Sequence, residues 1–328
     1  MLNRTIAPAF KTIDKIDIHR THEHRLGNGI QLFTLSAGSQ EITKIELIFR
    51  AGMYMQPATL VASATNNLLE SGTRSFTANE LSEGIDFYGS FLELQVEQDY
   101  ATVTLYSLNK YLDESLRFVE EIIKYPVFPE KEFKIYITNK KQKHAINSQK
   151  VSILAKRKFT EVLFGEQHPY GRQVQESDFS RISVGDLHEF FKNNYTAGSC
   201  TIIASGCLPQ NLTEVIEKHF GGSDWGRTQS PVSAFVPAEI PAAKHHYIHR
   251  PDAIQSAIRV GKLLFNKTHP DYYKFQVLNT VLGGYFGSRL MANIREDKGY
   301  TYGIGSGISN LVHAGYFFIS TEVGADVT

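Results

Sequence analysis

The feature that most constrains this chain is an internal repeat. Residues 66–94, NNLLESGTRSFTANELSEGIDFYGSFLEL, resemble residues 279–307, NTVLGGYFGSRLMANIREDKGYTYGIGSG. Each segment is expected to hold a helix ending in glycine, a second helix, and a glycine-containing turn into a strand. An alternating strand follows each segment, at 101–109 and at 315–323. Because such self-similarity marks copies of one structural unit, the chain is predicted to contain two related domains.

The remaining patterns predict an α+β protein. Alternating apolar residues indicate strands, and amphipathic stretches indicate helices. Thr77 and Glu80 have the spacing of a capping box, which predicts that a helix starts there. The expected strands are 29–37, 42–52, 90–98, 101–109 and 199–206, and the expected helices are 58–71, 110–126, 129–164, 183–195 and 211–221.

The predicted domains are joined by a linker. Residues 222–244 hold three prolines and show no periodicity, which is typical of a connecting segment. We therefore expect an N-terminal domain at 1–224, a linker at 225–244 and a C-terminal domain at 245–328. The second unit reaches Thr328 directly after its paired strand, so within these residues the second domain is expected to be partial.

Charge and hydropathy exclude several classes of partner. Lys+Arg and Asp+Glu both number 34, so nothing favours nucleic acid or an anionic membrane. No apolar run is long enough for membrane insertion, and the N-terminus shows no evident signal peptide, which leaves cytoplasm and periplasm both open. The two cysteines, Cys200 and Cys207, are interpreted as inert thiols, with Cys200 in a core strand.

The chain resembles the M16 family, the pitrilysin-like inverzincin peptidases and their non-catalytic relatives. The resemblance runs from about His24 onward and rests on the order of several short motifs. These are LGNGIQLF, RAG, ESGTRSFTANEL, HPYGR, LHEFFKNNYTAGSCTIIASG and GGYFGSRLMANIREDKGYTYGI. It implies two related α+β domains, each a mostly antiparallel sheet with helices packed on one face.

Active members of that family carry H-x-x-E-H on a helix before Gly-Thr. The two histidines share a helix face and bind zinc, and the glutamate activates the bound water. Aligned on Gly72-Thr73, these positions are Ser63, Asn66 and Asn67, so every required group is absent. The resemblance also implies a distal glutamate ligand, but residues 133–160 contain no Glu or Asp. The zinc site is therefore interpreted as vacated, and no metal or other cofactor is expected in this chain.

Other histidines do not offer an obvious replacement. The stretch His19–His24, HRTHEH, has the wrong spacing and is expected to be an exposed N-terminal arm. His245 and His246 would point to opposite faces of a strand. An active zinc peptidase with an unusual site at the N-terminal histidines remains a weaker alternative.

Arg295 and Tyr302, seven positions apart, are the candidate functional pair. The resemblance implies that an Arg and a Tyr at this spacing reach a zinc site, bind the substrate carbonyl and stabilise the oxyanion. Guanidinium and phenol are donors suited to developing negative charge. In the alternative interpretation, Arg295 pairs with Glu296 or Asp297 and Tyr302 only packs.

Together these features resemble the non-catalytic subunit of a heterodimeric M16 peptidase. Such a chain would supply Arg295 and Tyr302 in trans to a partner that carries H-x-x-E-H and zinc. The implied substrate is an extended peptide, added as a strand at an edge near 89–97, where this chain has Phe91 and Leu92. The alternative from another class is a structural or peptide-binding relative with no peptidase role.

Overall fold

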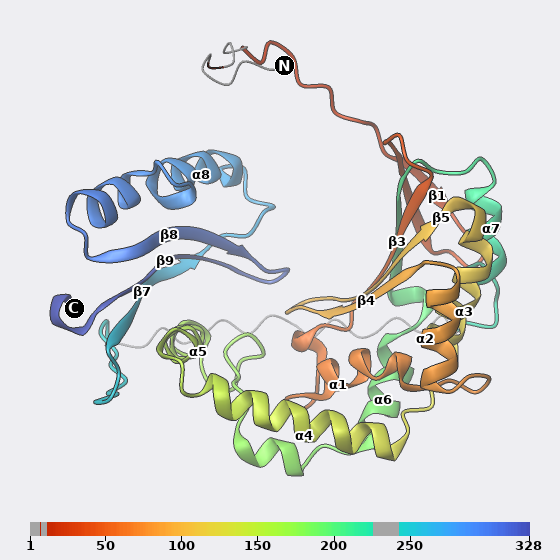
Figure 1. Ribbon diagram of the computed structural model, residues 1–328, viewed down its shortest axis with the longest axis horizontal. Helices are drawn as coiled ribbons and strands as arrows, with labels where there is room; N and C mark the ends of the chain where they lie inside the picture. Colours follow the sequence, from red (N-terminus) through yellow and green to blue (C-terminus); the bar gives the residue numbers. More distant parts are fainter. Residues whose placement is uncertain (1–6, 8–11, 226–242) are drawn as a thin grey trace.

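The computed structural model describes residues 7, 12–225 and 243–328, and their strands form two sheets (Figure 1). The larger sheet has six strands in the order β1-β2-β6-β3-β5-β4. It is mixed, because β2 and β6 run parallel while the other neighbouring strands run antiparallel. Its strands are β1 His22–Arg25, β2 Gln31–Ser36, β3 Ile42–Phe49, β4 Phe91–Val96, β5 Ala101–Leu108 and β6 Cys200–Gly206.

The smaller sheet has three antiparallel strands, β7 Gln255–Leu264, β8 Thr301–Asn310 and β9 Gly315–Gly324. Their order is β7-β9-β8, which corresponds to β3-β5-β4 in the larger sheet. In both units the third strand along the chain lies between the first and the second. The two segments that resemble each other in sequence thus have the same local topology.

Helices connect and cover the strands. They are α1 Val61–Asn67, α2 Ala78–Phe87, α3 Leu112–Lys124, α4 Glu130–Asn147, α5 Val151–Phe164, α6 Val184–Asn194, α7 Leu212–Phe220 and α8 Tyr272–Asn279. Thr280–Gly284 and Met291–Asp297 are π-helical. The predicted capping box opens α2: the Glu80 amide donates to the Thr77 hydroxyl at 3.3 Å, and the Thr77 amide donates to the Glu80 carboxylate at 2.8 Å.

The core lies between the larger sheet and its helices. On β3, Ile45, Leu47 and Phe49 alternate inward and are fully buried, whereas Lys44 and Glu46 alternate outward and form an ion pair at 2.8 Å. Helices α1 and α2 contact β4, and α3 contacts β5, on the buried face. Burial of each such aliphatic side chain stabilises the fold by about 1.5–3 kcal/mol, so this alternation fixes which face the helices cover.

The single long helix expected over 129–164 is wrong, because α4 ends at Asn147 and α5 starts at Val151. Lys150, between them, has an extended backbone (φ −86°, ψ 121°). The break redirects the chain so that α5 packs on β7 of the smaller sheet (Figure 1). Phe159 of α5 occupies space that a side chain at Gly261 would take, since a Cβ there would lie 2.7 Å from its ring.

A second apolar cluster joins the two parts of the molecule. Its buried members come from the turn at Met53–Met55, the end of α5, the following loop and the β8–β9 hairpin. They are Tyr54, Phe164, Tyr170, Leu311 and Tyr316. The tips of the β4–β5 and β8–β9 hairpins meet beside this cluster (Figure 1).

The predicted N-terminal arm is partly wrong. His22–Arg25 is strand β1, which pairs antiparallel with β2. The pairing satisfies backbone groups that β2 would otherwise leave unpaired at the sheet edge.

Two further sequence predictions concern the membrane and the linker. Within the part of the chain that the structure describes, no helix is both long and apolar enough to cross a bilayer. Of the predicted linker 225–244, residues 226–242 lie outside the described residues.

Candidate functional site

Helix α1 carries the three positions at which a zinc peptidase of this kind would have its H-x-x-E-H groups. Asn66 is fully buried there. Its side-chain amide donates to the Gln95 carbonyl of β4 at 3.1 Å, and its oxygen accepts from the Tyr195 hydroxyl at 3.0 Å. Burial raises the pKa of Tyr195 well above its ordinary value, so the phenol is a fixed neutral donor. Asn66 therefore ties α1 to the sheet and to the end of α6.

Ser63 and Asn67 are half-buried and bond within their own helix. The Asn67 amide donates to the Ser63 carbonyl at 2.7 Å, and the Ser63 hydroxyl donates to the Leu60 carbonyl at 3.0 Å. Tyr136 of α4 lies beside Ser63, and burial raises the pKa of Tyr136 to about 12. Lys140 lies over that ring, with its Nζ 5.2 Å from the ring centre. A neutral phenol and a cation do not suit Zn²⁺, which binds thiolate, imidazole and carboxylate, so these residues do not fit a zinc ion.

The histidines of the N-terminal region are not gathered into a metal site. His24 bonds to a neighbour in the sheet, with its Nε2 3.3 Å from the Thr34 hydroxyl. Across residues 7, 12–225 and 243–328, no group of three or more His, Cys, Asp or Glu side chains is arranged to hold a metal ion.

The structure brings Arg295 and Tyr302 together. The Nε of Arg295 donates to the Tyr302 carbonyl at 2.9 Å, and its guanidinium lies 5.8 Å from the Tyr302 ring centre and 4.7 Å from that of Phe286. The contact to Glu296 is a longer one, 3.7 Å between Nη1 and Oε1. Tyr302 does not pack into a core, because 94% of its surface is exposed. The pair thus presents a phenol to solvent next to a guanidinium held by its backbone.

A β-bulge displays Tyr302. Thr301 pairs with Val323 and Ile304 with Thr321, so Tyr302 and Gly303 together oppose one residue of β9, Glu322. Such an extra residue re-aims a strand side chain, and bulges are common beside functional sites.

Two threonine hydroxyls hold the bulge. Thr301 donates to the Glu322 carbonyl at 2.6 Å and accepts from the Gly303 amide at 3.1 Å. Thr321 donates to Thr301 at 2.9 Å and to the Gly303 carbonyl at 3.0 Å. These threonines were not predicted from the sequence, although a threonine directly before Tyr302 was a visible signal.

Tyr302 also borders a cavity of about 530 Å³ between α5 and the smaller sheet. Arg259 of β7 enters this cavity, with its guanidinium 4.8 Å from the Phe318 ring centre and 5.7 Å from that of Phe159. Arg259 was not predicted from the sequence either. The sequence signal was a charged residue on the strand face that otherwise carries small or apolar residues such as Ala257 and Gly261.

Strand β4 forms the edge of the larger sheet, with β5 as its neighbour. Phe91 is 60% exposed there, and its ring lies 6.0 Å from that of Tyr106. Leu92 alternates to the other face and packs against the core. The outer side of β4 has no strand neighbour among the described residues, so its backbone groups are placed for an added strand.

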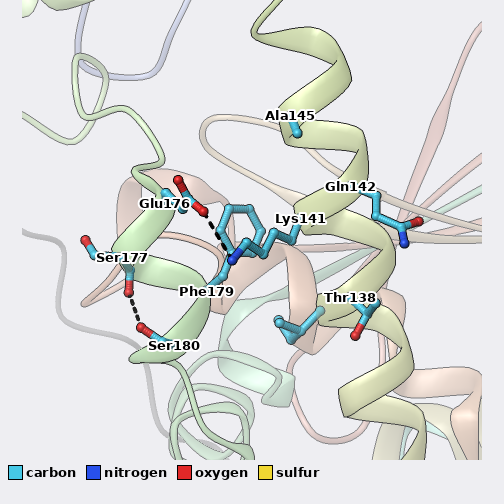
Figure 2. Close-up of a pocket in the computed structure, with 9 residues that line it drawn as sticks. Thr138, Lys141, Gln142, Ala145, Glu176, Ser177, Phe179 and Ser180 are labelled. Atoms are coloured by element: carbon cyan, nitrogen blue, oxygen red, sulfur yellow. Dashed lines mark hydrogen bonds and ion pairs between the residues drawn. The ribbon is translucent and has the colours of Figure 1, made fainter.

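A second cavity, of about 580 Å³, lies between α4 and the short 3₁₀ helix Glu176–Ser180 (Figure 2). Lys141 and Glu176 bridge it with an exposed ion pair of 3.2 Å. Figure 2 shows Phe179 beneath that pair and the Ser180 hydroxyl turned back to its own turn, where it donates to the Ser177 carbonyl at 2.8 Å. Among the described residues that line this cavity, no nucleophile has a base beside it.

Comparison with known proteins gives a consistent family likeness. A family profile described as the peptidase M16 inactive domain matches residues 181–327. The crystal structure of a peptidase M16 inactive domain from Pseudomonas fluorescens superposes with a TM-score of 0.86 at 25% identity, covering 93% of this chain and 75% of that one.

Curated relatives point the same way. The "Uncharacterized zinc protease YmxG" of Bacillus subtilis is 23% identical over 262 residues, which is 78% of this chain and 61% of that protein. The chain therefore spans about three fifths of that relative's length. The human "Cytochrome b-c1 complex subunit 1, mitochondrial" is 20% identical over 234 residues, covering 67% of this chain and 46% of the human one.

Proposed function

The chain belongs to the M16 peptidase family and is of its inactive-domain type, and from this premise we propose that it is a non-catalytic subunit of a heterodimeric zinc metallopeptidase. In this proposal the partner subunit carries H-x-x-E-H and the zinc ion. This chain supplies Arg295 and Tyr302 to the partner's site. Its two related domains are assigned to residues 1–224 and 245–328.

One observation carries the proposal: Arg295 and Tyr302 are held together at a bulge, and the phenol faces solvent. A tyrosine with this exposure contributes little to its own domain, yet hydrogen bonds of Thr301 and Gly303 hold the backbone on both sides of it. Meanwhile α1 and α4 offer no ligand set for zinc. Exposed donors combined with a helix pair that offers no zinc ligand set are suited to work on a neighbour's substrate.

The chemistry of the pair fits peptide hydrolysis. When water attacks a peptide carbonyl, negative charge develops on its oxygen, and fixed donors aimed at that oxygen lower the barrier. Removal of one such donor costs roughly a hundredfold to a thousandfold in rate. The extended peptide would add to a sheet edge, and in this chain the β4 edge with Phe91 and Leu92 is the counterpart.

The test combines this chain with an M16 chain that carries H-x-x-E-H from the same genome. Hydrolysis of a quenched fluorescent peptide is measured for each chain alone and for the mixture. We expect activity in the mixture only, and a loss of about a hundredfold for Arg295→Ala or Tyr302→Phe. Arg289→Ala, which removes an exposed arginine of the same region, is the matched control and should leave the rate unchanged. Full activity of the Arg295→Ala mixture would refute the proposal.

The likeness to the human bc1 subunit favours a second candidate function, a structural or peptide-binding subunit without a peptidase role. In that case the chain would assemble with partners, and substitution of Arg295 or Tyr302 would change neither assembly nor any hydrolysis. Peptide hydrolysis by the co-purified wild-type and Arg295→Ala complexes separates the two candidates, because only the first predicts that Arg295→Ala lowers the activity.

A further inference from the structure

Arg259 has an unusual electrostatic position. It is partly buried, and burial lowers the pKa of its guanidinium, although an arginine stays protonated near neutral pH. Its described contacts are the rings of Phe318 and Phe159. Among residues 7, 12–225 and 243–328, no carboxylate lies within ion-pair distance of it and no acceptor takes a hydrogen bond from its side chain. A half-buried cation without a counter-charge is costly unless a ligand supplies one.

The strand register determines which side chains lie beside Arg259. Arg259 lies opposite Ser320, and Ala257 lies opposite Glu322, so both β9 side chains share the face of Arg259. Ser320 and Ser152 of α5 bring hydroxyl groups to the same cavity. Glu322 is exposed and is the one carboxylate among the described residues that line this cavity.

The geometry points to an anion-binding subsite in this cavity, in which Arg259 takes the carboxylate of a bound peptide. Aromatic rings lie over the guanidinium and restrain it, while its in-plane N–H groups remain for a planar, bidentate acceptor. Carboxylate matches that fork, and the serine hydroxyls suit its remaining lone pairs.

The position of the cavity identifies the ligand as part of the same peptide. Tyr302 lines it and also lies near Arg295, so a chain held at the pair passes directly by Arg259. To this extent the inference rests on the proposed function and deepens it, because it makes peptides that place a carboxylate beside Arg259 the preferred substrate class. The carboxylate belongs either to an Asp or Glu side chain or to the peptide C-terminus.

Binding to this chain without a partner tests the subsite. Fluorescence anisotropy is measured with labelled peptides that differ only in one internal Glu or Gln, each made with a free or an amidated C-terminus. We expect about tenfold tighter binding wherever the recognised carboxylate is present, as for a charge-assisted hydrogen bond. A difference between the Glu and Gln peptides assigns the carboxylate to a side chain. A difference between the free and amidated peptides assigns it to the C-terminus. Equal binding of all four peptides would overturn the inference.

Two variants attribute the preference to this cavity. Arg259→Met keeps the packing between Phe159 and Phe318 and should abolish the acid preference without changing binding of the neutral peptide. Glu322→Gln alters an exposed side chain, so it tests the inference even if Arg259→Met does not fold. Removal of this negative charge from the cavity lining should reduce repulsion of the ligand carboxylate and tighten acidic-peptide binding severalfold. An unchanged preference in Arg259→Met, or no gain in Glu322→Gln, contradicts the subsite, and Arg289→Ala controls for general charge loss.

The two hypotheses fail in different ways. If the acid preference depends on Arg259 but no mixture ever hydrolyses peptide, the subsite stands and the peptidase role fails. If Arg295→Ala inactivates a mixture while Arg259→Met binds acidic and neutral peptides as the wild type does, the role stands and the subsite fails.

Discussion

The backbone amide of Val312 donates to the carboxylate of Asp99 at 2.9 Å across 213 residues of sequence. The hydroxyl of Tyr170 donates to the other oxygen of the same carboxylate and accepts from the His313 amide at 3.4 Å. Asp99 lies at the tip of the β4–β5 hairpin, and Val312 at the tip of the β8–β9 hairpin. One carboxylate thus links the sheet that carries the candidate peptide edge to the sheet whose strand β8 carries Tyr302.

Substitution of Asp99 should therefore destabilise the joint between the sheets. Asp99→Ala leaves the Tyr170 hydroxyl and the Val312 amide without their acceptor, and we expect a loss of about 1–3 kcal/mol in the free energy of unfolding. Urea denaturation followed by tyrosine fluorescence and circular dichroism measures it. Asp252→Ala, at an exposed position, is the control and should change stability by less than about 0.5 kcal/mol. Equal effects of the two substitutions would contradict the linking role of Asp99.

Restoration of the motif on α1 should not restore a zinc site. The triple variant Ser63→His, Asn66→Glu, Asn67→His places a carboxylate at a fully buried position and still lacks a distal acidic ligand over residues 133–160. We expect no stoichiometric zinc and a lower stability than the wild type, because a buried carboxylate cannot donate to the Gln95 carbonyl as the Asn66 amide does. Metal analysis of the purified variant decides the first point, and Asn66→Ala gives the stability reference. One tightly bound zinc per chain would show that our account of α1 is wrong.

The hydroxyls that hold the bulge should act as a unit. Thr301→Val and Thr321→Val remove partners of the same network, so their effects on stability should not add. We expect a coupling free energy of at least about 0.5 kcal/mol in a double-mutant cycle measured by denaturation. Thr268→Val, paired with Thr301→Val, is the uncoupled control, because Thr268 bonds locally to Asn266. Additive effects of Thr301→Val and Thr321→Val would mean that the bulge does not depend on this network.

Stability should fall in acid through the ion network between α3 and α7. Burial alone would raise the pKa of Glu120, but its hydrogen bonds to His219 and Lys124 hold that pKa below the ordinary value of 4.5. The bond from Lys218 likewise lowers the pKa of Asp113 below 3.8. A carboxylate with a lowered folded-state pKa stabilises the protein above its ordinary pKa, and this contribution is lost as pH falls through the folded value.

The free energy of unfolding should accordingly decrease as pH falls below about 4.5, and Glu120→Gln should flatten that decrease. Denaturation curves at a series of pH values between neutrality and acid provide the measurement. Glu189→Gln, which changes a carboxylate elsewhere on the surface, should leave the slope as in the wild type. If Glu120→Gln and the wild type had the same slope, Glu120 would not contribute to the loss of stability in acid.

Local features of the fold were predictable because short-range interactions specify them. The Thr77–Glu80 capping box opens α2 from within one turn, and the alternation of Ile45, Leu47 and Phe49 assigns a buried face to β3. The break between α4 and α5 was missed, since residues 148–150 contain neither Gly nor Pro. Only the contact of α5 with β7 requires the chain to turn there.

The candidate site likewise combines features that the sequence predicted with features that depend on the tertiary structure. The spacing of Arg295 and Tyr302 was visible in the sequence, but their contact depends on a π-helical turn and on a bulge in register with β9. Arg259 was missed because the lack of a counter-charge is a property of all its spatial neighbours, which come from β9, β8 and α5.

The order of residues alone predicts the repeated unit and the presence of the Arg/Tyr pair. It also shows that zinc ligands are lacking at Ser63, Asn66 and Asn67. Those are questions of which groups exist and how they are spaced along the chain. The fold determines that Asn66 is buried and bonded, that Tyr302 is exposed beside Arg295, and that Asp99 meets Val312. Burial, exposure and pairing arise between segments up to 213 residues apart, and such contacts form only when sheet register and helix packing bring those segments together.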